Sequence, residues 1–124
     1  MAIKINLEST VIPVEIGDLK FQIDVTDETY ERYVQAFNSF LDDVSELDET
    51  TSEDLTLLKA KQRNVYDVLL GEGAFESIYE LAPSVVITTG ILTQVVEQLE
   101  KEMMKRLDGR SIKAVPKKKI TKIK

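Results

Sequence analysis

The residues of this chain that most suggest chemistry stand together in the stretch LLGEGAFESIYE, at residues 69–80. Glu72 lies between Gly71 and Gly73, where a general acid or a phosphate-binding loop could be built. A Walker loop, however, needs four residues between its glycines and then Lys-Ser or Lys-Thr, and a dinucleotide fingerprint needs a third glycine. Neither pattern is present, so the stretch is not a phosphate cradle.

The composition removes the partners that a catalytic Glu72 would need. The chain of 124 residues has no cysteine and no histidine, which excludes thiol chemistry, histidine-based triads and the usual zinc sites. Acidic pairs such as Asp42-Asp43 lack the spacing of a calcium-binding EF-hand loop and are interpreted as a solvated face. We therefore expect no enzyme activity, no cofactor and no metal.

The same stretch is typical of a corner between two helices. Gly71 is expected to end one helix with a positive φ, and Gly73 to open a short helix after it. Phe75, Ile78, Tyr79 and Ala82 then follow at the three-to-four spacing of an apolar helix face. In this interpretation Gly71 and Gly73 are structural, and Glu72 has no catalytic role.

The first 25 residues alternate apolar and polar side chains, which predicts strands with one buried face. Ile3, Ile5 and Leu7 make up the first alternating run. Residues 12–16 and 19–25 continue the pattern on either side of Gly17-Asp18. A two-residue loop that starts with glycine predicts an antiparallel β-hairpin, and the run at residues 3–7 predicts a further strand before it.

From residue 26 to residue 109 the apolar period changes to about 3.6, which predicts helices. The first begins near Thr26 or Asp27, and the second at Thr51 or Ser52, where Asp54 resembles a capping box. The apolar stripe of the first helix consists of Tyr30, Tyr33, Val34, Phe37, Phe40, Leu41, Val44 and Leu47. The side chains of the second helix that are expected to face the core are Leu55, Leu58, Val65, Val68 and Leu69.

The longest helix is expected to follow Pro83-Ser84 and to end at Leu107 or Asp108, with Gly109 as its C-terminal glycine. Its start is rich in β-branched residues, so a strand at residues 85–89 competes with the helix, which is favoured on length. The sequence thus predicts a mainly α (α+β) fold of about four helices with a small N-terminal antiparallel β-hairpin. One globular domain is expected over residues 1–109.

Charge is divided unevenly along the chain. Residues 110–124 hold seven of the 16 basic residues and no acid, whereas the preceding residues hold nine basic and all 22 acidic ones. We expect an acidic body with a basic, disordered C-terminal tail that includes Lys117, Lys118 and Lys119. The tail could bind nucleic acid or an acidic neighbour, or only solubilise the chain. Salt-dependent nucleic-acid binding that is lost on deleting residues 110–124 would identify a nucleic-acid-binding regulator.

The order of these segments is similar to that of a known family. An alternating start that ends FQIDVTDETYERY, a charged middle, the stretch LLGEGAFESIYEL and a long apolar helix resemble the small tail assembly chaperones of long-tailed (siphovirus-type) phages and prophages of Gram-positive bacteria. The resemblance covers most of residues 19–108. It implies a non-enzymatic protein of the host bacterial cytoplasm that is absent from the mature virion.

The resemblance also implies partners. Proteins of this family bind the tape-measure protein, a long apolar helical client, and help to recruit the major tail protein during tail morphogenesis. Many are made in two forms through a ribosomal frameshift, and the lysine codons at residues 117–119 could hold a slippery site. Self-association into a ring or spiral is expected, a membrane is not, and nucleic acid is the less favoured partner. A structural tail or connector component retained in the virion is the alternative function.

Binding an apolar client requires apolar faces beyond those that the protein's own core uses. We expect such faces on the first helix and on the last, where methionine can adapt to varied partners. Ordinary core packing is the competing interpretation for each of these residues. The partner-binding candidates are Tyr30, Phe37, Phe75, Tyr79, Val86, Met103 and Met104.

Overall fold

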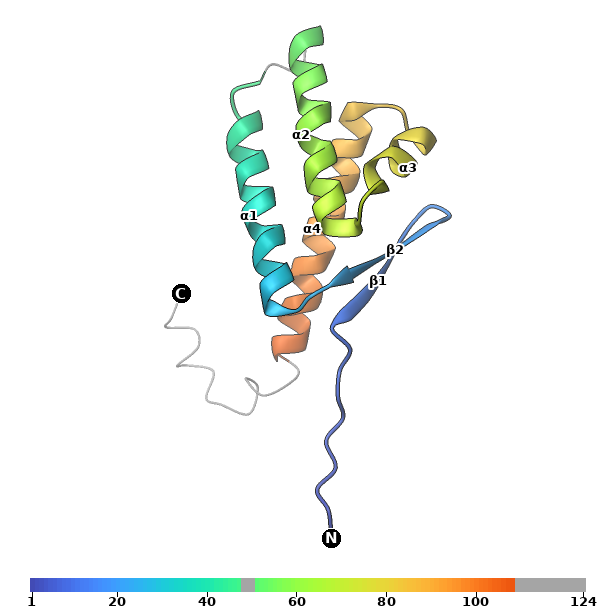
Figure 1. The fold of residues 1–124 in the computed structure, drawn as a ribbon, viewed down its shortest axis with the longest axis vertical. Coiled ribbons are helices and arrows are strands. Elements are labelled where there is room, and N and C mark those ends of the chain that lie inside the picture. The colour runs from blue at the N-terminus through green and yellow to red at the C-terminus, as the bar shows by residue number, and fades with distance from the viewer. Residues whose placement is uncertain (48–50, 109–124) are drawn as a thin grey trace. The chain divides into compact units, whose positions relative to one another are not determined.

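The structure is a computed structural model, and it describes residues 1–47 and 51–108. Two strands are followed by four helices (Figure 1), which confirms the mainly helical fold with a small N-terminal antiparallel sheet. The chain divides into two compact units, residues 1–88 and 89–124, and the boundary falls inside the last helix. Gly109 and the basic tail, including Lys117, Lys118 and Lys119, lie outside the described residues.

The predicted β-hairpin is confirmed. Strand β1 (Val11–Ile16) pairs antiparallel with β2 (Leu19–Asp24), and Ile16 lies opposite Leu19 across the Gly17-Asp18 loop. Gly17 has a φ of 59°, a left-handed value that glycine adopts without steric cost. Because Ile12 pairs with Ile23 and Val14 with Phe21, the apolar residues of both strands share one face of the sheet.

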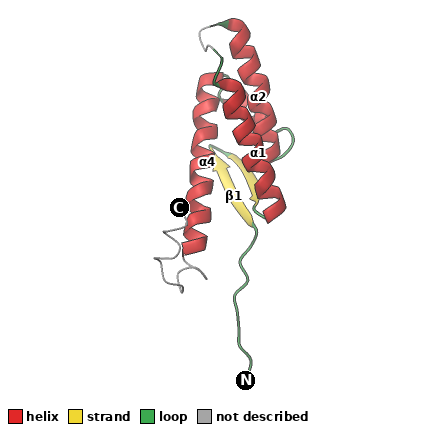
Figure 2. Cartoon of the chain, turned by 90° about the vertical axis from the view of Figure 1, so that its left-hand side faces the viewer, coloured by secondary structure: helices red, strands yellow, loops and turns green. Residues whose placement is uncertain are grey.

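The further strand predicted at residues 3–7 is wrong. Residues 1–9 contain no strand, and the exposed fractions of Ile3, Ile5 and Leu7 are 90%, 83% and 96%. Alternation gives a segment the side-chain pattern of a strand, but a strand also needs a neighbour for its backbone groups. The sheet of the described residues consists of β1 and β2 alone, and residues 1–9 precede β1 as an extended segment (Figure 2).

The first two helices begin where the sequence predicts. Helix α1 (Asp27–Val44) has Thr26 as its N-cap, although the Thr26 hydroxyl pairs with the Thr29 hydroxyl at 2.6 Å rather than with a backbone N–H. Helix α2 (Ser52–Leu70) has Thr51 as its N-cap, and the Thr51 hydroxyl accepts a hydrogen bond from the Asp54 N–H at 3.2 Å. Within residues 1–88, α1 and α2 run side by side (Figures 1 and 2).

The glycine corner is also confirmed. Helix α2 ends at Leu70 and helix α3 (Ala74–Leu81) follows, with φ values of 109° at Gly71 and 86° at Gly73. Asp67 on α2 accepts a hydrogen bond from the Phe75 N–H at 3.2 Å, so one side chain of α2 satisfies a donor at the start of α3. Glu72 is exposed on the turn between the glycines, as a corner residue should be.

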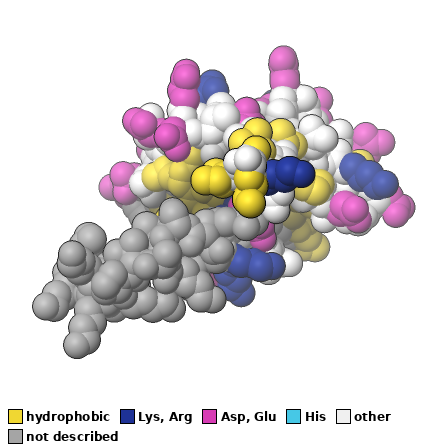
Figure 3. Space-filling model, turned by 90° about the horizontal axis from the view of Figure 1, so that it is seen from below, with side chains coloured by type: hydrophobic (Ala, Val, Ile, Leu, Met, Phe, Trp, Pro, Cys, Tyr) yellow, Lys and Arg dark blue, Asp and Glu magenta, His cyan; other side chains and the backbone are white. Residues whose placement is uncertain are grey.

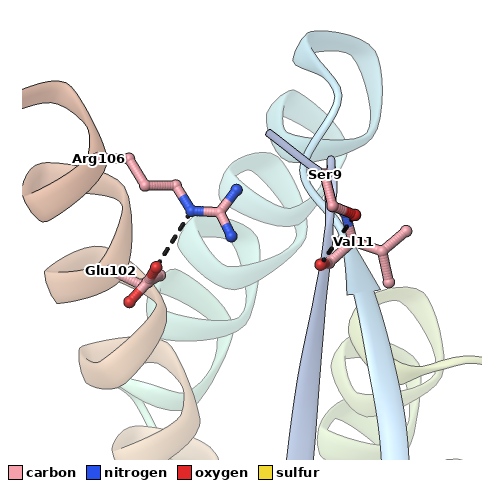
Figure 4. Close-up of polar contacts among 4 residues, drawn as sticks. All are labelled: Ser9, Val11, Glu102 and Arg106. Carbon is pink, nitrogen blue, oxygen red and sulfur yellow. Dashed lines mark hydrogen bonds and ion pairs between the residues drawn. The ribbon is translucent and has the colours of Figure 1, made fainter. Parts of the chain in front are cut away.

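Helix α4 (Val85–Asp108) confirms the helical alternative for residues 85–89 over the strand. The Ser84 hydroxyl accepts a hydrogen bond from the Ile87 N–H at 3.3 Å, so this serine acts as the helix cap. Near the other end, Arg106 Nε lies 3.1 Å from a Glu102 carboxylate oxygen, which forms an i,i+4 ion pair along the helix (Figure 4). Leu92, Val95 and Leu99 of α4 are buried.

The core of residues 1–88 is built around α2 and α3. Val68, predicted to point inward, is 37% exposed. The buried face of α2 includes Gln62 and Tyr66 instead, so it is rotated around the helix from the predicted face. The buried apolar residues of the core of residues 1–88 are Ile23, Val25, Phe40, Leu58, Val65, Tyr66, Leu69, Leu70, Ala74, Phe75 and Ile78.

Two buried polar side chains, Gln62 and Thr88, complete this core. The Thr88 hydroxyl lies 2.5 Å from Gln62 Oε1, and Gln62 Nε2 donates to the Val85 carbonyl at 3.3 Å. The Tyr66 hydroxyl donates to the Thr88 carbonyl, so this fully buried ring also has a polar partner. The network anchors the first turn of α4 to α2 through groups that are satisfied inside the core.

Candidate protein-binding surfaces

One partly open apolar surface in residues 1–88 is a face of α1. At 100° per residue, seven of its large apolar side chains fall within about 120° of the helix circumference. Phe40 stands at one margin of this stripe and is 5% exposed, whereas Val34 at the other margin is 42% exposed and Leu41 beside it 46%. We call these seven residues the α1 stripe: Tyr30, Tyr33, Val34, Phe37, Phe40, Leu41 and Val44.

The middle of the α1 stripe holds two of the predicted partner-binding residues. Tyr30 and Phe37 are half-buried, and the Phe37 ring stacks on that of Phe40 with centroids 6.2 Å apart. Phe40 is the only buried residue of α1. One margin of the stripe therefore packs in the core and the other meets solvent.

A second apolar surface surrounds the corner between α3 and α4. Leu81, Val86 and Ile87 are each more than half exposed, at 61%, 61% and 55%. Beside them lies an open hollow of about 370 Å³. Its lining residues are Ser52, Leu55, Thr56, Lys59, Tyr79, Pro83, Ser84, Val85 and Val86.

Tyr79 lies in the wall of this hollow, with the Lys59 ammonium 4.0 Å from the centre of its ring. A cation at this distance over an aromatic face is attracted by the ring quadrupole and keeps both side chains in place. The hollow thus combines a positive charge and several hydroxyl groups with the exposed apolar side chain of Val86. It is suited to an amphipathic partner more than to a small apolar molecule.

Phe75 does not belong to either surface. It is 1% exposed and its ring lies between those of Tyr66 and Tyr79, with centroids 5.6 Å and 5.5 Å away. A side chain buried in this way cannot contact a partner unless the core opens, so the structure assigns Phe75 to the core. Its place beside Tyr79 lets it fix the wall of the hollow from within.

The remaining predicted residues lie in the second unit or beyond it. On α4, Met103 is half-buried and Met104 is 56% exposed, one turn before Leu107 at 48%. These side chains give the end of α4 an apolar surface of its own. The basic-tail candidates Lys117, Lys118 and Lys119 lie outside the described residues.

Hydrophobic and charged side chains are both exposed on the face that Figure 3 shows. Figure 3 shows hydrophobic side chains gathered on one face of the molecule with Asp and Glu standing around them. Residues 1–47 and 51–108 hold no cluster of three carboxylates that could bind a metal ion, and none of their helices is long and apolar enough to cross a bilayer.

Sequence reasoning missed several of the exposed residues. Val34 and Leu41 were part of a recognised stripe, and their place at its margin was the signal that they could remain open. Leu81 and Ile87 had no such signal, because each belongs to a helix end whose exposure depends on the turn between them. Comparison of the chain with protein-family models, curated proteins and solved structures gave no match.

Proposed function

We propose that this chain is a phage tail assembly chaperone that binds the tape-measure protein and helps to recruit the major tail protein. The order and motifs of the sequence support this proposal through their resemblance to that family. The α1 stripe is the observation that carries it, since an 18-residue amphipathic helix with a single buried residue offers an apolar face to a partner.

The α1 stripe fits a client that is itself an apolar helix. Helices bind each other when side chains repeated every three or four residues fill a complementary groove, and the stripe presents that spacing. Burying the exposed part of a Val or Leu side chain contributes on the order of 1 kcal/mol. One copy would then bind weakly, and many copies along a long client would hold it in solution and still be displaced by the tail tube.

Self-association into a ring or spiral belongs to the same proposal. The chaperone would act in the cytoplasm of the host and would be missing from mature particles. A structural tail or connector component could use the same apolar faces, but it would remain in the virion. Mass spectrometry of purified particles distinguishes the two functions, because only the structural component should be detected there.

The direct test is co-expression of this chain with the tape-measure protein of the same genome. We expect soluble tape-measure protein when the unmodified chain is present. A double variant, Val34→Lys with Leu41→Lys, places two charges on the open margin of the α1 stripe and should leave the client insoluble. The stability of the variant should change little, because both side chains are more than two-fifths exposed.

The matched control adds the same two charges to the opposite side of the same helix. Gln35→Lys with Ser39→Lys alters exposed polar residues about 100° and 140° from Val34, so client solubility should be retained. Equal client solubility with the two double variants would argue against the α1 stripe as the binding face. A client that stays insoluble with the unmodified chain would contradict the chaperone function itself.

A further inference from the structure

The N-terminal segment, residues 1–9, has the side-chain pattern of a strand but no strand partner among the described residues. Its apolar residues Ile3, Ile5 and Leu7 are almost fully exposed, and Lys4, Asn6 and Glu8 alternate with them. Three large apolar side chains in a row on an extended segment are costly in water. The segment is thus suited to pairing with the edge of a sheet, where its backbone and its apolar face would both be satisfied.

The outer edge of β1 is poorly suited to accept such a strand. The register and the hydrogen bond from the Val25 N–H to the Thr10 carbonyl direct the backbone groups of Val11, Pro13 and Glu15 away from β2. Pro13 has no N–H to donate there. The Val11 N–H donates to the Ser9 hydroxyl at 3.0 Å (Figure 4), so a side chain of the same chain already satisfies it. Proline and local bonds of this kind protect an edge from strand addition.

The outer edge of β2 differs. By the same register, Lys20, Gln22 and Asp24 direct their backbone groups away from β1. The Asp24 carbonyl accepts a hydrogen bond from the Thr29 hydroxyl at 2.8 Å, which closes the end next to α1. The two-stranded sheet of the described chain leaves Lys20 and Gln22, toward the tip of the hairpin, with no strand beside them. Each of them has both an N–H and a carbonyl for a new strand.

A segment cannot reach the β2 edge of its own hairpin in antiparallel orientation. Both β1 and the added strand would be antiparallel to β2, and they would therefore run parallel to each other on opposite sides of it. Parallel strands need a crossover of about a dozen residues. Here only two residues separate Glu8 from β1, so the strand must come from another molecule.

We propose that residues 3–8 of one copy add as an antiparallel strand to the outer edge of β2 in a second copy. The register that matches both faces places Asn6 opposite Gln22. Ile5 then lies opposite Ile23, and Leu7 opposite Phe21, on the apolar face of the sheet. This addition buries side chains that are exposed in a single copy and extends the sheet to three strands.

Charge complementarity selects this register. Glu8 lies opposite Lys20, and since Lys20 already pairs with Glu15 of β1, the lysine would stand between two carboxylates. At the other end Lys4 lies opposite Asp24. A shift by two residues in either direction removes these pairs, and one of the two shifts places Glu8 opposite Asp18. Opposite charges across neighbouring strands stabilise a sheet and like charges destabilise it.

This inference names the contact for the self-association included in the proposed function, and it rests on that part of it alone. The donated segment and the accepting edge are different surfaces, so each copy can donate to one neighbour and accept from another. Contacts of this heterologous kind produce rings or open spirals rather than closed pairs. The client-binding α1 stripe takes no part in the contact, and the two proposals can fail separately.

Disulfide trapping tests the register directly, since the chain has no cysteine of its own. A single variant, Asn6→Cys, is mixed with a second, Gln22→Cys, and oxidised. Residues opposite each other in a hydrogen-bonded antiparallel pair have Cα atoms about 5.5 Å apart, which a disulfide can bridge. We expect a mixed disulfide joining position 6 to position 22 as the main product, identified by peptide mass spectrometry.

The matched control mixes Ile5→Cys with Gln22→Cys. Its cysteine lies one residue away but on the other face of the strand, so the mixed disulfide should form in far lower yield. Similar yields from positions 5 and 6 would overturn the proposed register. A mixture in which positions 6 and 22 do not link at all would overturn strand addition at this edge.

A variant without cysteine tests the association itself on the full chain in the absence of client. Ile5→Lys with Leu7→Lys should weaken self-association by more than about tenfold in sedimentation, and the fold should be retained because both side chains are exposed in one copy. An unmodified chain that sediments as a monomer at all concentrations would overturn the proposal, and so would a variant that associates like it. Neither result would affect the proposal that the α1 stripe binds the client, which the client-solubility experiment tests by itself.

Discussion

Helices α1 and α2 are nearly equal in length, at 18 and 19 residues, and both start at a threonine cap, yet they are buried very differently. Six residues of α2 are buried, against Phe40 alone on α1. The comparison teaches that the clarity of an apolar stripe does not measure how deeply a helix is buried. The stripe of α1 is continuous and half open, whereas the buried face of α2 includes Gln62 and Tyr66.

Neighbouring elements explain the difference. Within residues 1–88, α2 packs against α1, against α3 and against β2, so its circumference is covered from several sides. Helix α1 packs mainly against α2 in the same unit. A helix enclosed on several sides must satisfy its polar atoms internally, as the Gln62 network does, while a helix at the margin can leave apolar atoms in water. The open margin is the reason that we propose α1 as the binding face.

The largest predicted difference in stability is between a Phe→Ala substitution in the core and the same substitution on the α1 stripe. Phe75→Ala removes a fully buried ring between Tyr66 and Tyr79 and should lower the free energy of unfolding by about 3–5 kcal/mol. Phe37→Ala on the half-open α1 stripe should cost about 1 kcal/mol, since less apolar surface is lost. Urea denaturation of both variants measures the contrast. Equal losses of stability would mean that the α1 stripe is as much a part of the core as α3 is.

A smaller contrast concerns glycine at the corner that holds the core together. Gly71 has a φ of 109°, a conformation in which any side chain is strained, and Gly71→Ala should destabilise the protein by about 1–3 kcal/mol. No atom lies within 4 Å of a methyl group placed there, so the strain would be in the backbone. Gly71→Val should be at least as harmful.

Two controls sharpen this prediction. Gly90→Ala, in the second turn of α4 and with equal space around it, should instead stabilise the protein by about 0.5–1 kcal/mol. Glu72→Gln should leave both stability and client binding nearly unchanged, because Glu72 is an exposed turn residue. Thermal melts of Gly71→Ala, Gly90→Ala and Glu72→Gln show whether each substitution raises or lowers the stability of the protein. A large loss of function from Glu72→Gln in a folded protein would reopen the catalytic interpretation of this corner.

Replacing a threonine hydroxyl by a methyl group should affect stability differently at a buried and at an exposed position of α4. Thr88→Val leaves Gln62 Oε1 without the hydroxyl 2.5 Å away and should cost about 1–2 kcal/mol. Thr93→Val changes the same residue type at an exposed position whose hydroxyl donates to the Thr89 carbonyl, and it should change stability by less than about 0.5 kcal/mol. Chemical denaturation compares them. Equal effects would show that the network contributes little.

Local signals predicted the elements of this fold well. The Gly17-Asp18 loop, the threonine caps and the Gly71-Gly73 corner each depend on the conformation of a few neighbouring residues, so the sequence alone carries the information. Burial depends on distant neighbours, and there the predictions failed in both directions. Val68 was expected inside and is exposed, while Gln62, a polar residue with no helical signature of burial, is fully buried.

The candidate site shows the same division. The α1 stripe was recognised from its spacing, but which margin stays open depends on where α2 lies. Phe75 followed the same spacing as Tyr79 and proved to be core, because its ring packs on the buried Tyr66 of α2, whereas Tyr79 lies half-buried beside Lys59. The N-terminal segment was predicted as a strand from its alternation, and only the structure shows that the sheet of the described residues does not include it.

The smallest predicted effect lies at the contact between the two helices compared above. Lys61 on α2 places its ammonium 3.2 Å from a carboxylate oxygen of Asp43 on α1, and both side chains are more than a third exposed. Solvent and salt screen such a pair, so Asp43→Asn should cost between about 0.2 and 1 kcal/mol at low salt and less at high salt. Urea titrations at two ionic strengths measure it. A larger, salt-independent loss would mean that this ion pair holds α1 against α2, and that the open stripe owes its position to charge as well as to Phe40.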